Sequence, residues 1–229
     1  YLKFFLLNNR PRPINLRRRV KNIIFISDFV SKRFKGYKFQ NKSIIYPFLK
    51  DFDKIKFKEE YNKTKSFKGV FLGQIEKHKG IIELCSYIKE INIDLGYNKI
   101  KLDIYGKSLS GLDKEIILNF NSFVNIINDK SRDYILDSLH LYDVGFFPSI
   151  WEEPFGIAQI EMLAAGLPVI STGRGGSKEA LLNNNSILYL DKKSFKKNLI
   201  DLLDNYDLDG SNLGKLARNT VNEKFVSSI

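Results

Sequence analysis

The sequence predicts an α/β fold, a Rossmann-like parallel sheet with helices on both faces. Short apolar runs recur from about residue 67 onward, and such runs are typical of strands buried on both faces. Segments with apolar residues at helical spacing lie between these runs. The connections are short, so strands and helices alternate as they do in a parallel sheet built from strand–helix–strand units.

Six segments are predicted to be strands. Each is four to six residues long, is rich in β-branched or aromatic residues, and is bounded by residues that favour turns. In chain order they are Gly69–Leu72, Ile100–Tyr105, Phe123–Ile127, Val144–Pro148, Pro168–Ser171 and Ser186–Leu190.

Five segments between and after these strands are predicted to be helices. In the first, apolar residues recur at i, i+3, i+4, i+7 and i+10 and form one stripe; they are Ile81, Leu84, Cys85, Ile88 and Ile91. Similar stripes run over Glu115–Phe120, Arg132–His140, Ile157–Ala165 and Phe195–Leu203. Ligands of such sheets bind beyond the carboxyl ends of the strands, so the residues that follow each strand are the candidates for chemistry.

The composition is that of a globular chain. Its 229 residues are 43% hydrophobic and 28% charged, which excludes a disordered chain, and no apolar run approaches the roughly 20 residues that span a bilayer. The lone Cys85 excludes an internal disulfide and suits a reducing compartment, so we expect a cytoplasmic location. The chain begins at Tyr1 rather than Met, and we expect it to be a fragment or a processed product.

The positive charge is concentrated at one end of the chain. The net charge is +11, and residues 1–40 hold 11 basic side chains against one acid, Asp28, which leaves the rest nearly neutral. A basic segment of this kind favours nucleic acid, an anionic membrane surface or a phosphorylated substrate. Charge alone does not choose among the three.

Glycine and lysine follow the first predicted strand. Gly73 and Gln74 come directly after it, and Lys79 and Gly80 precede the next helix. A glycine lets backbone approach a ligand, and a lysine near a helix N-terminus suits a phosphate. The spacing matches neither the dinucleotide fingerprint nor the P-loop, and a surface turn is an equal alternative. Gly106 repeats the pattern after the second strand, where a tight turn explains it equally well.

The most informative segment spans residues 147–161. Pro154 and Gly156 come just before a helical pattern, so free backbone amides there can hold a diphosphate without a metal. Glu153 and Glu161 are eight residues apart, a little over two helical turns, and we expect both carboxylates to face one edge of a ligand with vicinal hydroxyls. A buried structural acid is the alternative for Glu161.

A glycine-rich loop follows the fifth predicted strand, over residues 172–179. Its hydroxyl groups, Thr172 and Ser177, can donate to a ligand. A strand-to-helix turn with a capping residue is the alternative.

These segments together resemble the C-terminal, nucleotide-sugar-binding domain of the retaining GT-B glycosyltransferases of group 1. The matching segments lie in order over roughly residues 67–225; they are Gly73, Lys79-Gly80, Tyr105-Gly106, Pro148-Ser149, Glu153-Pro154-Phe155-Gly156, Glu161, Ala165-Gly166-Leu167-Pro168, Gly175-Gly176 and Glu179. The paired glutamates are the hallmark of that family. By this resemblance, residues 67–229 form the donor domain, and residues 1–66 are a basic remnant of the N-terminal acceptor domain and the interdomain linker.

The resemblance also implies roles for individual residues. Lys79 would neutralise the diphosphate of the donor and Glu153 would contact the transferred sugar, which makes them the candidate catalytic residues. Glu161 would bind the ribose, and Phe123–Ile127 would flank the base. The remaining candidate substrate contacts are Gly73, Gln74, Gly106, Phe155, Gly156 and Ile157.

One position departs from the family. In that family an arginine usually follows the glycine at the end of the first strand, whereas this chain has the neutral Gln74 there. Three explanations stay open: Lys77 or Lys107 supplies the missing positive charge, the chain binds its donor more weakly, or the protein is a degenerate member of the family.

The family implies transfer with retention of configuration, with no metal or other cofactor. The partners would be a nucleotide-sugar donor and a saccharide or lipid-linked acceptor, with peripheral contact at the inner face of an anionic membrane as a further option and no nucleic acid. We expect this chain alone to bind donor weakly and transfer nothing.

Two alternatives remain open from the sequence. The first is a basic module that binds nucleic acid or a membrane surface through its N-terminal segment. The second is a related GT-B enzyme, an epimerase or a phosphorylase. Short acidic strings at Asp51–Asp53 and Asp207–Asp209 lack the context of a metal site and were set aside.

Overall fold

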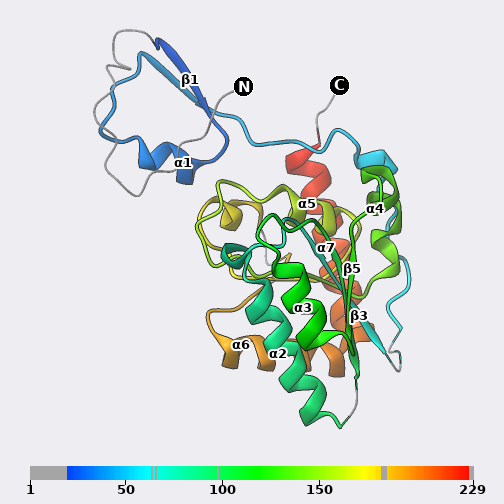
Figure 1. Ribbon diagram of the computed structural model, residues 1–229. Coiled ribbons are helices and arrows are strands. Elements are labelled where there is room, and N and C mark those ends of the chain that lie inside the picture. The colour runs from blue at the N-terminus through cyan, green and yellow to red at the C-terminus, as the bar shows by residue number, and fades with distance from the viewer. Residues whose placement is uncertain (1–19, 63, 65, 97, 182–184, 227–229) are drawn as a thin grey trace.

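Six parallel strands form the central sheet of the computed structural model (Figure 1), which describes residues 20–62, 64, 66–96, 98–181 and 185–226. The strand order is β5-β4-β3-β6-β7-β8. The bounds are β3 Phe67–Leu72, β4 Ile100–Tyr105, β5 Val124–Ile127, β6 Val144–Phe147, β7 Val169–Ser171 and β8 Ile187–Leu188. The order reverses between β3 and β6, which is where an open parallel sheet of this kind binds its ligand.

Helices cover both faces of this sheet, as predicted (Figure 1). One core cluster packs α2 (Ile81–Asp94), α3 (Leu112–Phe120) and α6 (Lys192–Asp204) against the sheet. A second packs α4 (Arg132–Ser138), α5 (Ile157–Ala164) and α7 (Ser211–Phe225) against the opposite face. Within β3, Phe67 and Phe71 belong to the first cluster, and Val70 and Leu72 belong to the second. Side chains of a strand alternate between faces, so one short apolar run supplies both cores.

The elements that were predicted differ from the observed ones mainly at their ends. The predicted helix 132–140 is divided into α4 and a 3₁₀ turn, Leu139–Leu141. Helix α6 begins at Lys192 because the Asp191 side chain accepts the backbone N–H of Ser194, a capping box that the apolar stripe alone does not show. Helix α7 was not predicted.

The last predicted strand, Ser186–Leu190, contains only Ile187–Leu188 as β8. This strand is at the edge of the sheet and pairs with β7 alone.

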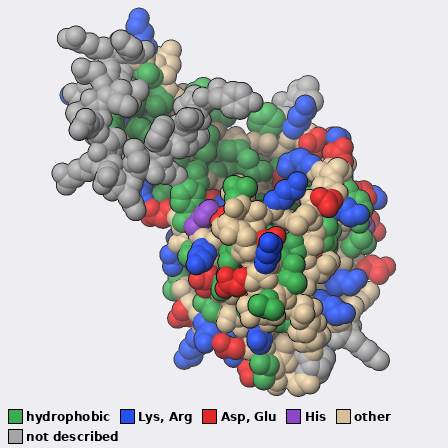
Figure 2. Space-filling model, in the orientation of Figure 1, with side chains coloured by type: hydrophobic (Ala, Val, Ile, Leu, Met, Phe, Trp, Pro, Cys, Tyr) green, Lys and Arg blue, Asp and Glu red, His purple; other side chains and the backbone are tan. Residues whose placement is uncertain are grey.

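Residues 20–46 form a small lobe beside the sheet domain, which we call the N-terminal lobe. It contains β1 (Asn22–Phe25), α1 (Asp28–Arg33) and β2 (Asn41–Ile44), and its two strands pair in parallel. Figure 2 shows hydrophobic side chains where this lobe meets the sheet domain and interspersed acidic and basic side chains over the sheet domain. The basic residues between positions 1 and 19, which carry much of the predicted positive segment, lie outside the described residues.

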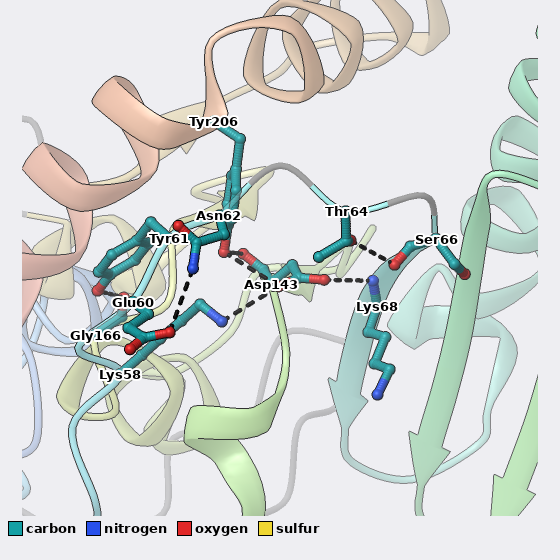
Figure 3. Close-up of polar contacts among 10 residues, drawn as sticks. All are labelled: Lys58, Glu60, Tyr61, Asn62, Thr64, Ser66, Lys68, Asp143, Gly166 and Tyr206. Carbon is teal, nitrogen blue, oxygen red and sulfur yellow. Dashed lines mark hydrogen bonds and ion pairs between the residues drawn. The ribbon is translucent and has the colours of Figure 1, made fainter.

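The segment between the lobe and β3 is packed onto the sheet domain through a buried polar network (Figure 3). Lys58 Nζ lies 3.2 Å from Asp143 Oδ1, and Asp143 Oδ2 accepts the backbone N–H of Lys68 at 2.8 Å. The hydroxyl of Tyr206 donates to the backbone carbonyl of Asp143 at 2.9 Å. Tyr61 belongs to the first core cluster, so packing against the sheet begins before residue 67.

Among the described residues, no helix combines the length and the apolar character needed to cross a bilayer.

Candidate donor-binding site

A cavity of about 320 Å³ lies at the carboxyl ends of β3 and β6. Seven of the nine predicted site residues line it: Gly73, Gln74, Lys79, Glu153, Phe155, Gly156 and Ile157. Gly106 and Glu161 are not in its lining. The loops that follow two neighbouring strands therefore converge on one site, although they are separated by more than 70 residues of chain.

A partly buried ion pair joins the two candidate catalytic residues. Lys79 Nζ lies 2.7 Å from Glu153 Oε1, and the side chains are 22% and 6% exposed. The hydroxyl of Ser149 donates to the same carboxylate oxygen at 2.8 Å. The Lys79 ammonium also lies 5.9 Å from the centre of the Trp151 ring. Protein contacts thus hold the cation and the carboxylate at one wall of the cavity.

The turn that carries Lys79 is fixed by close backbone packing. Gly80 has a φ of +70°, and a Cβ atom there would overlap the carbonyl of Pro148. The backbone N–H of Ile150 donates to the carbonyl of His78 at 3.1 Å. The left-handed glycine lets the turn after β3 lie directly against the loop after β6, and this contact brings Lys79 to Glu153.

Backbone amides line another wall, at the start of α5. Gly156 precedes the helix with a φ of +93°, and no side chain in the described part of the chain caps this N-terminus. The first-turn amides of a helix lack partners within the helix, and the helix dipole makes this end positive. The Phe155 ring is only 2% exposed, so the backbone of residues 155–157 is what this loop offers to an anion.

Gly106 lies outside the cavity lining and packs against the turn at Gly73, so its predicted contact with substrate stays a prediction. A Cβ atom at this position would overlap the carbonyl oxygen of Gly73, so only glycine at position 106 lets the two backbone segments pack this closely. Gln74 lines the cavity, whereas Lys77 and Lys107, the two cations considered as substitutes for the missing arginine, do not.

Glu161 lies on the buried side of α5, 5% exposed, and forms an ion pair with Arg132 of α4. Burial raises the pKa of its carboxyl group, and Arg132 acts in the opposite direction. Because α5 begins only at Ile157, helical spacing cannot be counted from Glu153, and the expectation that Glu153 and Glu161 face one edge of a ligand stays a prediction. The ribose-binding role of Glu161 stays a prediction.

The glycine-rich loop uses its hydroxyl groups internally. The Thr172 hydroxyl donates to the carbonyl of Ser149, and the Ser177 hydroxyl donates to the carbonyl of Arg174, both at 2.7 Å. Gly175 pairs with Glu153 as an isolated parallel β-bridge. The loop therefore supports the Glu153 segment, which agrees with the structural alternative rather than with direct ligand contact.

Several cavity residues were not among the predicted site residues, and Ser149 and Ile26 are the most informative of them. Ser149 follows the end of β6 directly, and this position in a parallel sheet was a signal that could have found it. Ile26 belongs to the N-terminal lobe and also lines the cavity. It is 127 residues before Glu153 in the chain, so no local sequence pattern could have placed it at this site. Among the described residues, no group of three or more His, Cys, Asp or Glu side chains is placed to hold a metal.

Comparisons with known proteins agree with this geometry. The sequence model described as "Glycosyl transferases group 1" matches residues 51–220. The chain is 30% identical, over 186 residues, to the capsular polysaccharide biosynthesis glycosyltransferase CapM of Staphylococcus aureus; the match covers 77% of this chain and 47% of CapM. The chain thus spans about half the length of this relative.

Solved structures share the fold at low sequence identity. HepE of Anabaena, in complex with UDP and glucose, superposes with a TM-score of 0.76 at 16% identity, over 92% of this chain and 61% of HepE. The pneumococcal O-GlcNAc transferase GtfA, in complex with UDP and GlcNAc, gives 0.70 at 18% identity, over 92% and 43%. Since the family match includes most of the sheet domain and its motif residues, the chain belongs to the group 1 glycosyltransferases, and its sheet domain has the fold of these structures.

Proposed function

We propose that this chain holds the nucleotide-sugar donor of a retaining glycosyltransferase in the cavity between β3 and β6. The observation that carries the proposal is the convergence of Lys79, Glu153 and the uncapped start of α5 on one cavity. A cation and free amides suit a diphosphate, and a carboxylate suits sugar hydroxyls. A nucleotide-sugar contains both a diphosphate and sugar hydroxyls, so one molecule would use all of these protein groups.

The roles follow from charge. Lys79 and the amides around Gly156 oppose the negative charge that develops on the diphosphate when its bond to the sugar breaks. Glu153 accepts hydrogen bonds from the sugar and holds it for attack by an acceptor. We propose that this stabilisation needs no metal ion.

A UDP-sugar is the first donor to test, because HepE and GtfA are described in complexes with UDP and a sugar. The acceptor is proposed to be a saccharide or a lipid-linked saccharide, in keeping with the capsular polysaccharide role in the name of CapM. Peripheral contact with an anionic membrane and the absence of a nucleic-acid partner stay predictions.

The test is calorimetric titration of the chain with UDP-, GDP- and ADP-sugars, with and without Mg²⁺. Lys79→Met should weaken binding of the preferred donor about 10- to 100-fold, the loss expected for a charge-assisted hydrogen bond of about 1.5–3 kcal/mol. Glu153→Gln should weaken the nucleotide-sugar more than the free nucleotide. Lys77→Met is the matched control, because Lys77 is in the same turn but outside the cavity lining.

Equal losses in the Lys77 and Lys79 variants would show a general charge effect and contradict the proposed site. A wild-type chain that binds no nucleotide would contradict the proposed function. Sugar transfer by the chain without added protein would contradict the expectation that it acts only as the donor half.

A further inference from the structure

We propose that Glu179 is a positioning residue for this site, and that its carboxylate ties the N-terminal lobe to the loop that places Glu153. The proposal rests on the proposed function, because its consequence is read at the donor sugar. It concerns a residue that lies outside the lining of the cavity.

Both carboxylate oxygens of Glu179 are bonded to the N-terminal lobe. Oε2 accepts the backbone N–H of Asp28 at 2.8 Å, and Oε1 accepts that of Phe29 at 2.7 Å. These amides belong to the first turn of α1, where they lack helical partners. Burial and then a hydrogen bond with Glu179 raise the pKa of the Tyr46 hydroxyl, so a third residue of the lobe meets the same carboxylate.

The short turn that carries Glu179 also holds the backbone of Glu153. It spans Gly176–Ala180, and the N–H of Gly176 donates to the carbonyl of Glu153 at 2.6 Å. A Cβ atom at Gly176 would overlap the carbonyl of Pro154 and lie 2.8 Å from the hydroxyl of Ser27. The lobe, the Glu179 turn and the cavity loop are therefore in direct contact.

Ser27 provides a second connection between the lobe and the cavity loop. Its hydroxyl donates to the carbonyl of Pro154 at 2.6 Å and accepts the N–H of Val30 at 3.1 Å. The side chain is fully buried. The residue that caps α1 is thus also a partner of the loop that follows Glu153, and Tyr46 stacks on Phe155 of the same loop with ring centres 5.4 Å apart.

Removing the carboxylate should loosen Glu153 without removing a group that touches the nucleotide. Glutamine in place of Glu179 keeps one acceptor oxygen, but its amide nitrogen cannot accept the second backbone N–H. The Glu153 carboxylate then loses its fixed place beside Lys79. The sugar should lose affinity, while UDP, which is held by Lys79 and the α5 amides, should keep it.

The experiment measures two quantities on Glu179→Gln. The first is the ratio of the UDP Kd to the UDP-glucose or UDP-GlcNAc Kd, which should fall about tenfold, with the UDP Kd unchanged within about twofold. The second is acrylamide quenching of Trp151, the one tryptophan of the chain, which should increase without any ligand. Lys32→Gln is the matched control, because Lys32 is on α1 and pairs with Asp28 at the surface; both quantities should match wild type.

Wild-type ratios and wild-type quenching in Glu179→Gln would overturn the proposal. If no nucleotide binds to the wild type, the proposed function fails, and the quenching measurement still decides the positioning role. If Glu179→Gln does not fold, Ser27→Ala replaces it. This change removes the hydroxyl that bonds the Pro154 carbonyl and caps α1, and it should also increase quenching. Unchanged quenching in a folded Ser27→Ala would equally overturn the proposal.

Discussion

Replacement of Lys58 by Met should test how strongly the buried pair with Asp143 holds the linker on the sheet. The side chains of Lys58 and Asp143 are 10% and 9% exposed. Removal of Lys58 therefore leaves the Asp143 carboxylate buried without its cation, and a loss of this kind lowers the free energy of unfolding by about 3–5 kcal/mol in other proteins. Asp143 keeps the N–H of Lys68. We therefore expect the low end, about 3 kcal/mol, or a Tm lower by about 6–12 °C for a chain of this size.

The assay is urea unfolding and thermal unfolding of Lys58→Met beside Lys56→Met. Lys56 is in the same segment between the lobe and β3, and its Nζ atom lies 2.8 Å from Asp137 Oδ1. The side chains of Lys56 and Asp137 are 59% and 55% exposed. A surface pair of this kind contributes about 0–1 kcal/mol. Lys58→Met with Asp143→Asn should lose less than the sum of the single changes. If Lys58→Met costs no more than Lys56→Met, the reasoning from burial is refuted.

Three further predictions follow from the same structure. Gly106→Ala should weaken UDP-sugar binding about tenfold by displacing Gly73, whereas Gly36→Ala, where a Cβ atom meets nothing within 4 Å, should not alter it in the same titration. Because burial raises the pKa of Glu161 above its ordinary value of 4.5, ionisation costs more in the folded state, so the unfolding free energy should fall as pH rises from about 4.5 through the folded-state pKa. Glu161→Gln should lack this fall in urea unfolding between pH 4 and 8, and an identical pH profile would contradict it. Burial also raises the pKa of Cys85 to about 12, so the native chain should resist a thiol reagent at pH 8 and react only in denaturant; rapid native labelling would contradict this.

The regular part of the sheet domain was predictable from the sequence because its signals are local. Apolar residues at period 3.6 or in short runs identify elements that need burial on one or both faces. Helix α7 was missed although its Ala217, Val221 and Phe225 are buried. The π-helical turn Tyr206–Gly210 precedes it. Since no predicted strand follows this segment, the alternation of strands and helices gave no reason to expect a helix there.

The motif residues were also found from the sequence, but their partners were not. Seven predicted positions line one cavity, since loops after neighbouring parallel strands meet at the same edge. Gly106 and Glu161 turned out to face other neighbours, the Gly73 carbonyl and Arg132. Which group a side chain meets depends on packing, and residue type and spacing do not contain that information.

By itself, the sequence determined the alternation of strands and helices, the edge of the sheet that carries the chemistry, and the Glu153-to-Gly156 loop. The tertiary structure alone decided that Lys79 pairs with Glu153 across 74 residues of chain and that Glu179 binds α1 across 151. Periodicity is a property of neighbouring residues, whereas these contacts form only when separate elements pack together.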